Sequence, residues 1–463
     1  MSTILIKGGT VVTSWGISRQ NVYIQEDKIA EVSINDYHKA DLIIDASGLY
    51  ILPGAVDTHV HFNDEFMGTM SVHDYYTGTL AAAYGGVTSI IDFSNQIPGK
   101  PLIHTLEKKF KEAEGKALID YGIHPVITNL TGKILDEIPV LVEKGAPTIK
   151  CYMTYRSEGL MMEIPDLKRI LSRLADSGGM LLVHAEDNET IENNVSRWIN
   201  QGKTAAIFHA RSRPPESEYK AILNCIKIAE ETGGRLFIVH LSTDKGMNAV
   251  SSARKKGQHV YAETCTHYLI FSEERLKRED GIKWICSPPL RNRRIRQKLW
   301  EGISDGRISL VSSDDAAYSW KAKLMGKDRF DRCPNGIPGI EPRLNLLYSE
   351  GVVKNRITLS RLVELVCTNP AKWFGLWPRK GQIDPGADAD IILFDPKKKW
   401  IMSQSSLHMA SDWSAYEGIE ITGKIEKVFS RGELIIDGDK CLARKGRGEY
   451  LHRRLTSGPP DLA

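Results

Sequence analysis

The central part of the chain alternates short apolar, β-branched segments with longer segments whose apolar residues recur every three or four positions. The first pattern is typical of buried strands and the second of amphipathic helices. Eight strands are predicted, at Ala55–Phe62, Val87–Phe93, Tyr121–Thr128, Thr148–Tyr155, Met180–Ala185, Leu236–Leu241, His259–Thr266 and Ile308–Ser313. Helices are predicted between most of them, including Tyr75–Tyr84, Leu102–Ala113, Asp166–Asp176, Glu218–Glu231 and Ile295–Ile303. This alternation indicates an α/β fold, a (β/α)8 TIM-like barrel of parallel strands.

A doubly wound open sheet is the alternative reading of the same pattern. That fold commonly carries a glycine-rich phosphate-binding turn directly after its first strand. Here the first predicted strand is followed by Asn63, Asp64 and Glu65 instead. The barrel is therefore favoured.

Both ends of the chain are rich in short β segments separated by turn residues, among them Asn21–Gln25 and Glu433–Asp437. We expect them to form one β-sandwich that flanks the barrel. The predicted organisation is residues 1–52 for the first part of the sandwich, 53–378 for the barrel and 379–440 for the second part of the sandwich. Residues 441–463 would form a basic C-terminal tail in contact with another subunit.

Composition narrows the class of protein. The 463 residues include 61 Lys and Arg against 58 Asp and Glu, a net charge of +3 that is weak evidence against a nucleic-acid partner. The apolar runs are too short to span a membrane. The seven cysteines are scattered without a C-x-x-C pair, which favours neither a disulfide framework nor a thiolate zinc site. Because the first residues also lack the pattern of a signal peptide, we expect a cytoplasmic protein.

Four histidines stand near the ends of predicted strands. His59 and His61 are two residues apart, a spacing that places both imidazoles on one face of a strand. His184 and His240 each close a strand after three apolar residues. Any one of them could be an ordinary pocket or core histidine. In a barrel, however, the carboxyl ends of all strands meet at one face, so together they predict a metal site.

Lys150 and Asp314 are the other residues that suggest chemistry. Lys150 lies inside an apolar strand, where an unpaired ammonium costs several kcal/mol. It could pair with a buried acid, or it could react with CO₂ to become a carbamate, an anion able to bridge two metal ions. Asp314 follows the eighth predicted strand, where it could cap a helix or bind metal and carry a proton.

These residues lie within stretches that resemble the amidohydrolase superfamily, and within it the hydantoinase/dihydropyrimidinase family of cyclic amidases. The similarity runs over almost the whole chain in one order. The stretches that carry it are Gly54–His61, Thr148–Tyr155, Val183–Glu186, Arg213–Glu216, Ile238–His240, Ala262–Tyr268, Ser287–Arg291, Ser313–Asp314, Pro334–Gly336, Lys380–Asp390 and His408–Gly418.

The resemblance implies a site for two divalent metal ions. One ion would be held by His59, His61 and Asp314, the other by His184 and His240, and carbamylated Lys150, N6-carboxylysine formed with CO₂, would bridge them. Imidazole and carboxylate ligands suit Zn²⁺ best, with Mn²⁺ or Co²⁺ as alternatives.

The resemblance also implies the reaction. A hydroxide bridging the two metals would attack the ring amide of a hydantoin or dihydropyrimidine and open it to an N-carbamoyl amino acid. Asp314 would carry the proton to the leaving nitrogen, and Tyr155 would donate to the oxyanion. Ser287 and Asn335 would bind the imide edge of the substrate. Members of this family suggest a homotetramer, or a dimer.

Three departures from the family pattern affect the substrate. Asn63 replaces the arginine with which dihydroorotases bind a carboxylate, so that substrate is disfavoured. Asp315 stands where the family usually has His, Asn or Gln, and the 316–320 loop also differs. We expect Asp315 not to be a ligand and Asp315→Asn to be tolerated. Tyr155 favours hydantoinase over allantoinase.

The alternatives are therefore an allantoinase or another amidohydrolase of cyclic ureides or purine rings, a non-catalytic dihydropyrimidinase-like protein, and a nucleobase deaminase. The non-catalytic relatives have lost metal ligands, whereas all six ligand positions are present here. The deaminases generally use one metal without a bridging lysine, so Lys150 argues against them.

Overall fold

The computed structural model describes residues 3–35 and 39–456. Eight parallel strands form a sheet in the order β17-β16-β15-β14-β13-β12-β11-β8. They are β8 (Ala55–Val60), β11 (Val87–Asn95), β12 (Asp120–Val126), β13 (Thr148–Tyr152), β14 (Met180–His184), β15 (Arg235–Ile238), β16 (Val260–Cys265) and β17 (Leu310–Ser312). Each overlaps a strand predicted from the sequence, and the predicted barrel is confirmed.

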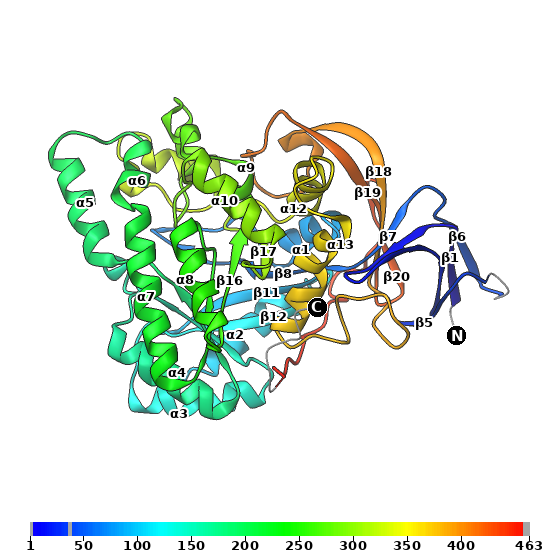
Figure 1. Cartoon of the computed structure of the whole chain (residues 1–463), viewed down its shortest axis with the longest axis horizontal. Coiled ribbons are helices and arrows are strands. Elements are labelled where there is room, and N and C mark those ends of the chain that lie inside the picture. The colour runs from blue at the N-terminus through cyan, green and yellow to red at the C-terminus, as the bar shows by residue number, and fades with distance from the viewer. Residues whose placement is uncertain (1–2, 36–38, 457–463) are drawn as a thin grey trace.

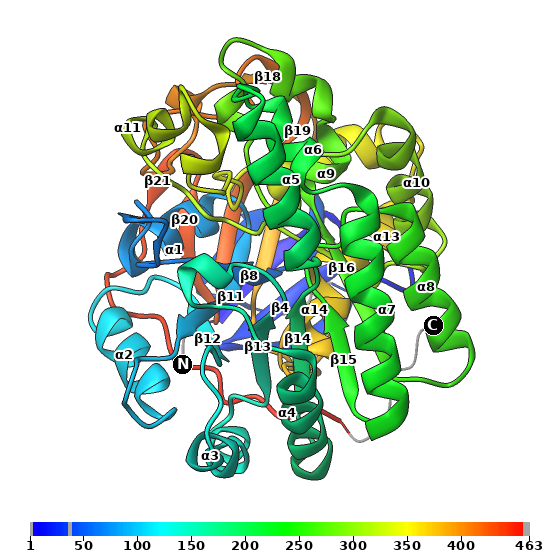
Figure 2. The ribbon, with the colours of Figure 1, turned by 90° about the vertical axis from the view of Figure 1, so that its left-hand side faces the viewer.

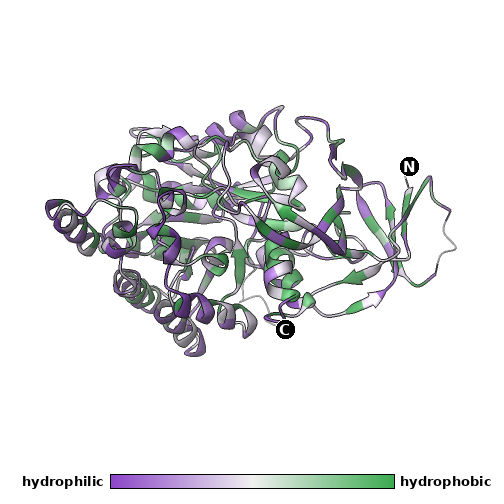
Figure 3. Ribbon diagram, turned by 90° about the horizontal axis from the view of Figure 1, so that it is seen from above, coloured by the Kyte–Doolittle hydropathy of each residue, from purple (hydrophilic) through white to green (hydrophobic). Residues whose placement is uncertain are grey.

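Helices surround these strands, as Figure 2 shows. They are α1 (Tyr75–Tyr84), α2 (His104–Ala113), α3 (Gly132–Glu143), α4 (Ile164–Ser177), α5 (Asn188–Asn200), α6 (Ile207–Ser212), α7 (Pro215–Thr232), α8 (Asp244–Lys255), α9 (Thr266–Ile270), α10 (Arg293–Ser304), α11 (Trp320–Lys323), α12 (Arg343–Leu347), α13 (Leu359–Val363) and α14 (Asn369–Trp373). Apolar residues concentrate on the strands and on the helix faces turned toward them (Figure 3).

The barrel closes between its last and first strands through backbone and side-chain contacts. The amide of Asp315 donates to the carbonyl of His59 at 3.3 Å, and the amide of His61 donates to the carbonyl of Asp315 at 2.9 Å. The buried guanidinium of Arg343 donates to the carbonyls of Val311 and Val56 at 2.8 and 3.1 Å. These contacts hold β17 and the segment after it against β8.

The two chain ends form the predicted β-sandwich, which lies beside the barrel in Figure 1. The smaller sheet contains β5 (Lys28–Ser33), β4 (Asn21–Gln25), β1 (Thr3–Lys7) and β6 (Leu42–Asp45). The larger sheet contains β21 (Lys440–Cys441), β20 (Glu433–Asp437), β19 (Ile419–Ser430), β18 (Ile391–Met402), β7 (Tyr50–Pro53), β2 (Thr10–Val12) and β3 (Ile17–Arg19). The pairing of β7 with β18 joins the first and last parts of the chain.

The segment after β21 runs along the amino-terminal end of the barrel. Tyr121, at the start of β12, donates to the carbonyl of Glu449 and accepts from the amide of Leu451. Leu451 and Arg453 are buried there. Contact of residues 441–463 with another subunit stays a prediction, and residues 457–463 of that tail lie outside the described part of the chain.

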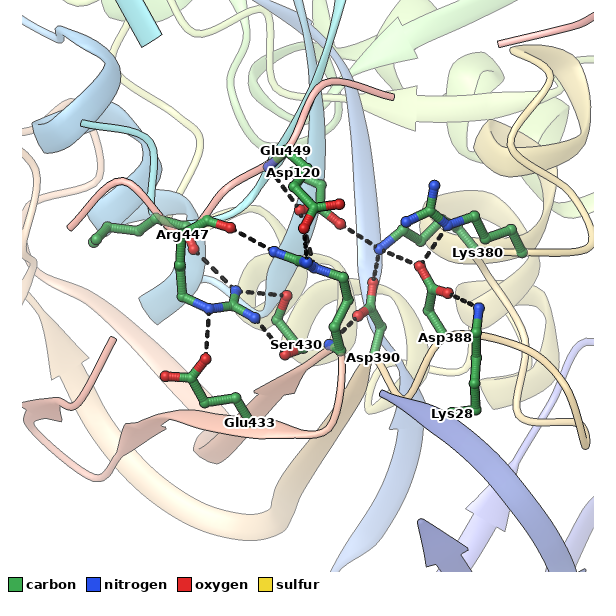
Figure 4. A network of polar contacts seen from close by, with 12 residues as sticks. Lys28, Asp120, Lys380, Asp388, Asp390, Ser430, Glu433, Arg447 and Glu449 are labelled. Carbon is green, nitrogen blue, oxygen red and sulfur yellow. Dashed lines mark hydrogen bonds and ion pairs between the residues drawn. The ribbon is translucent and has the colours of Figure 1, made fainter. Parts of the chain in front are cut away.

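A polar network joins the barrel, the sandwich and this tail (Figure 4). The buried amine of Lys380 lies 2.7 Å from Asp120 of β12 and 2.9 Å from both Asp388 and Asp390. Asp120 also accepts from the backbone amide of Glu449 at 3.0 Å. This network fixes the end of the barrel that is opposite to the predicted ligands. Across residues 3–35 and 39–456, no helix has the length and apolarity needed to cross a membrane.

Candidate active site

The structure brings the nine predicted site residues together at the carboxyl ends of the barrel strands. A cavity of about 50 Å³ is lined by eight of them, which are His61, Lys150, Tyr155, His184, His240, Ser287, Asp314 and Asn335. His59, the ninth, lies behind Asp314, with its Nε2 3.1 Å from Oδ1 of that carboxylate. The residues come from six different βα units, so only the closed barrel assembles them.

Three of these residues turn the backbone two or three positions after the end of a strand. Tyr155, His240 and Asp314 have φ angles of +66°, +38° and +51°, in the left-handed region that side chains other than glycine rarely adopt. The predicted strands therefore end earlier than expected, at Tyr152, Ile238 and Ser312. Left-handed residues of this kind collect at functional sites, where the surrounding structure holds them in place.

His59, His61 and Asp314 have ligand atoms that lie within 4.8 Å of one another. The imidazole of His240 lies near two others, with ring centres 5.3 Å from that of His59 and 4.5 Å from that of His184. Lys150 lies among them, its amine 4.8 Å from the ring centres of both Phe93 and Tyr152. The six predicted ligands thus surround one small space.

Three of the histidines contact carboxylates, of which Glu263 and Glu186 are buried and Asp64 is partly exposed. Glu263 lies 2.5 Å from Nδ1 of His59. The same arrangement pairs Asp64 with Nδ1 of His61 at 3.0 Å and Glu186 with Nε2 of His184 at 2.7 Å. A carboxylate on one ring nitrogen orients the other nitrogen as a metal ligand.

The pattern of the sequence assigns no role to these three carboxylates. Glu263 had one visible signal, because it is the one charged residue of strand β16, all of whose residues are buried. Asp64 and Glu186 follow their histidines by three and two residues, but nothing in that spacing distinguishes them from ordinary loop carboxylates.

Unpartnered polar atoms indicate that the site fits metal ions. Among the described residues, Nδ1 of His240 and Nζ of Lys150 are buried without a hydrogen-bond partner. Buried polar atoms of native proteins nearly always have a partner, so atoms left over around one space indicate a bound group. Imidazole nitrogens and carboxylate oxygens are the donors that Zn²⁺ and Mn²⁺ accept.

Burial and neighbouring charges together set the protonation states of the site. It lowers the pKa of Lys150 to about 8 and that of His184 to about 4, which leaves the ring neutral as a ligand must be. Burial would raise the pKa of Asp314, but His59 and His61 outweigh it and hold that pKa well below its usual range. Asp314 is therefore an anion at neutral pH.

Another part of the cavity is built around Tyr155. Burial raises the pKa of this phenol, so it stays protonated and can donate a hydrogen bond. Its oxygen accepts from Nδ2 of Asn335 at 3.3 Å. The guanidinium of Arg213 lies 5.1 Å from the ring centre of Tyr155 and pairs with Glu186 at 2.6 Å. Arg213 therefore connects the tyrosine to the support of His184, a link that the sequence did not predict.

Comparison with known proteins identifies relatives of this chain along nearly its whole length. Residues 50–435 match the model of the amidohydrolase family. The chain is 38% identical to the D-hydantoinase of Geobacillus stearothermophilus over 97% of this chain and 96% of that protein. It is 42% identical to a D-phenylhydantoinase of Escherichia coli over 99% of this chain and 100% of that protein.

Solved structures agree with these relatives. The dihydropyrimidinase of Brevibacillus agri superposes with a TM-score of 0.97 at 34% identity and covers 99% of this chain and 100% of its own. The L-hydantoinase (dihydropyrimidinase) of Arthrobacter aurescens gives a TM-score of 0.91 at 27% identity, over 97% of this chain and 99% of its own. The chain therefore belongs to the amidohydrolase family, in its hydantoinase and dihydropyrimidinase group of cyclic amidases.

Proposed function

We propose that this enzyme opens the cyclic amide ring of hydantoins or dihydropyrimidines to give N-carbamoyl amino acids. The observation that carries the proposal is the buried, unpartnered amine of Lys150 among four histidines and Asp314. A structural lysine would have an acid beside it, as Lys380 does at the other end of the barrel. The names of the relatives, D-hydantoinase, D-phenylhydantoinase and dihydropyrimidinase, support the same class of substrate.

Lys150 would be carbamylated. The neutral amine attacks the carbon of CO₂ and loses a proton, which gives an anionic carbamate with two oxygens. Only the neutral amine reacts, and burial supplies it by lowering the pKa of Lys150 to about 8. Carbamylation also replaces a positive charge at Lys150 with a negative one. An ammonium ion would repel metal ions held by the neighbouring ligands, whereas a carbamate attracts them.

His59, His61 and Asp314 would hold one divalent ion, His184 and His240 the other, and the carbamate would bridge them. Zn²⁺ is the ion that these donors suit best, with Mn²⁺ and Co²⁺ as alternatives. When bound, the two ions would make water nucleophilic at neutral pH and polarise the substrate carbonyl.

The chain's own residues would perform the remaining steps. The Asp314 carboxylate takes the proton of the attacking water and delivers it to the leaving ring nitrogen. The Tyr155 hydroxyl donates to the oxygen on which negative charge develops. Ser287 and Asn335, which line the same cavity, bind the imide edge and so orient the ring.

A panel of cyclic amides tests this proposal. Purified enzyme supplied with metal and bicarbonate is assayed for ring opening of dihydrouracil, dihydrothymine, hydantoin, both enantiomers of 5-phenylhydantoin, allantoin and dihydroorotate. We expect turnover of hydantoins or dihydropyrimidines and none of dihydroorotate. Turnover of allantoin alone would establish the allantoinase alternative, and ammonia release from a nucleobase would establish a deaminase.

We also propose a homotetramer in the cytoplasm. The seven free cysteines, six of them buried, are compatible with a reducing compartment. Light scattering at micromolar concentration tests the assembly, and a monomer would contradict it.

A further inference from the structure

Asp315, the residue after the proposed proton carrier, is completely buried and lies outside the lining of the cavity. Its Oδ1 accepts hydrogen bonds from the backbone amides of Gly339 and Ile340 at 2.7 and 3.1 Å. Its Oδ2 lies 2.6 Å from Nδ1 of His73, which is also completely buried. One carboxylate thus joins the segment after β17 to two other segments of the chain.

The direction of these hydrogen bonds follows from the contact on the far side of His73. The backbone amide of Ala410 donates to Nε2 of His73 at 3.2 Å, so Nε2 carries no proton in this bond. In the neutral ring the proton is then on Nδ1, which donates to Asp315. The Asp315 carboxylate therefore accepts all three of its hydrogen bonds, from the amides of Gly339 and Ile340 and from Nδ1 of His73.

The backbone of Asp315 is held as firmly as its side chain. Its amide donates to the carbonyl of His59 and its carbonyl accepts from the amide of His61. Short bridges pair Asp315 with Val60 on one side and with Ile337 on the other. Asp315 thus lies between the strand that carries two proposed ligands and the 335–340 segment that begins with Asn335.

We propose that Asp315 and His73 form a positioning pair that fixes the proton-carrying carboxylate of Asp314 and the substrate-binding segment at Asn335. The inference rests on the function proposed above. Asp314 has a left-handed backbone, a conformation that only its neighbours can enforce. The anchored side chain of Asp315 supplies that enforcement one residue away, and its bonds to Gly339 and Ile340 set the position of the segment opposite.

In this pair residue 315 must accept all of its hydrogen bonds and residue 73 must donate one to it. This proposal reverses the expectation that Asp315→Asn is tolerated. The oxygen of an asparagine could still accept from Gly339 and Ile340, but its amide group would face the Nδ1–H donor of His73. His73→Asn keeps a donor toward Asp315, because an asparagine N–H can take the place of Nδ1–H. His73→Leu removes the donor and keeps the bulk.

The chain offers a control in a second histidine–carboxylate pair, in which Glu341 is buried and His408 is partly exposed. Glu341 accepts from Nδ1 of His408 at 2.8 Å and from the amide of that residue at 2.6 Å. It lies beside Ile340 but contacts neither Asp314 nor the cavity. Glu341→Gln therefore measures the cost of weakening a neighbouring histidine–carboxylate pair while every hydrogen-bonding group of Asp315 and His73 stays in place.

The experiment compares Asp315→Asn, His73→Leu, His73→Asn and Glu341→Gln with the wild type, at a temperature where all remain folded. We measure kcat and KM with the best substrate of the panel, and metal affinity by competition with a chelator. Asp315→Asn and His73→Leu should each lose about 10–100-fold in kcat or metal affinity, the usual cost of removing a group that orients a metal ligand. His73→Asn should stay within a few-fold of the wild type, as should Glu341→Gln.

Wild-type kcat, KM and metal affinity in both Asp315→Asn and His73→Leu would overturn the proposal, and so would an equal loss in Glu341→Gln. If Asp315→Asn does not fold, the comparison of His73→Leu with His73→Asn tests the proposal, because only His73→Asn keeps a donor toward Asp315. Equal kcat, KM and metal affinity in these two folded variants would then overturn it. A wild type that opens no ring would refute the proposed function, while the chelator competition would still test the pair.

Discussion

At the scale of one residue, burial determines which protonation state of Lys150 is favoured. Its amine is completely buried, it contacts aromatic rings, and it has no hydrogen-bond partner among the described residues. Keeping it charged there would cost several kcal/mol. The same environment that disfavours the ammonium ion favours the neutral amine that CO₂ requires.

We predict that Lys150→Ala loses at least one metal ion and nearly all activity, because the proposed bridge is gone. Short carboxylic acids should restore part of both, since they can occupy the place of the carbamate. Metal content by atomic absorption and turnover with added acetate or propionate measure the effect. Lys380→Ala, which removes a buried but fully paired lysine, is the control and should lower stability while it keeps both metals. A Lys150→Ala enzyme with full metal content and normal turnover would contradict the carbamate.

Asp314→Asn should keep the fold and lose kcat by about 10²–10⁴-fold, the range for removal of a group that transfers a proton. The amide keeps the shape of the carboxylate but cannot accept and release the proton. Circular dichroism checks the fold and steady-state kinetics give kcat. Normal turnover in this variant would show that another group carries the proton.

At the scale of elements, the strands were predictable because their apolar runs are long and regular, and β14 begins at the predicted residue, Met180. The ends of β13, β15 and β17 were not predictable. Each stops two or three residues before a site residue with a left-handed backbone, and no local pattern of the sequence predicts that turn. The predicted strand ends are therefore wrong at the positions where the backbone leaves the extended conformation to place a site residue.

The site itself was predictable only where its residues follow strand ends. His184 and Lys150 could be named because each is a polar residue in an apolar run. The partnership of His59 with Glu263 joins residues from the first and seventh barrel strands, and that of His73 with Asp315 joins equally distant segments. Contacts between remote segments depend on the closed barrel, so spacing along the chain could not reveal them.

The segment that carries Asn335 packs closely enough to give a prediction of its own. A Cβ atom on Gly336 would lie 2.3 Å from the carbonyl oxygen of Ala316, so the backbone would have to move. We expect Gly336→Ala to raise KM more than it changes metal content, because the displaced segment carries the proposed substrate-binding residue Asn335 and no proposed metal ligand. Gly132→Ala, at a position with open space around it, is the control and should leave KM unchanged. Equal KM values in the two variants would contradict a role for this segment in binding.

At the scale of the whole molecule, the network around Lys380 makes stability depend on pH. Burial would lower the pKa of Lys380, but Asp390, Asp120 and Asp388 raise it above its usual value. A folded-state pKa above the unfolded value of about 10.4 means that the stabilisation is complete below that pH. It is lost as pH rises further, through the folded-state pKa.

We predict that the free energy of unfolding falls as pH rises above about 10.4, and that Lys380→Met makes this fall shallower. The variant should also be less stable at pH 8 by about 3–5 kcal/mol, since buried carboxylates are left without their cation. Urea unfolding between pH 8 and 11 measures both effects. A variant whose alkaline slope equals that of the wild type would show that other groups, such as tyrosines, control the transition.

The pairing of β7 with β18 has a consequence for the order in which the protein can be made. While a ribosome adds the residues between these strands, at about 5–20 per second, the edge of β7 has no partner for tens of seconds. Every proposed metal ligand precedes β18 in the chain. A nascent chain that stops short of Ile391 would therefore contain all the proposed site residues and still expose an unpaired strand edge, the kind of surface through which chains aggregate.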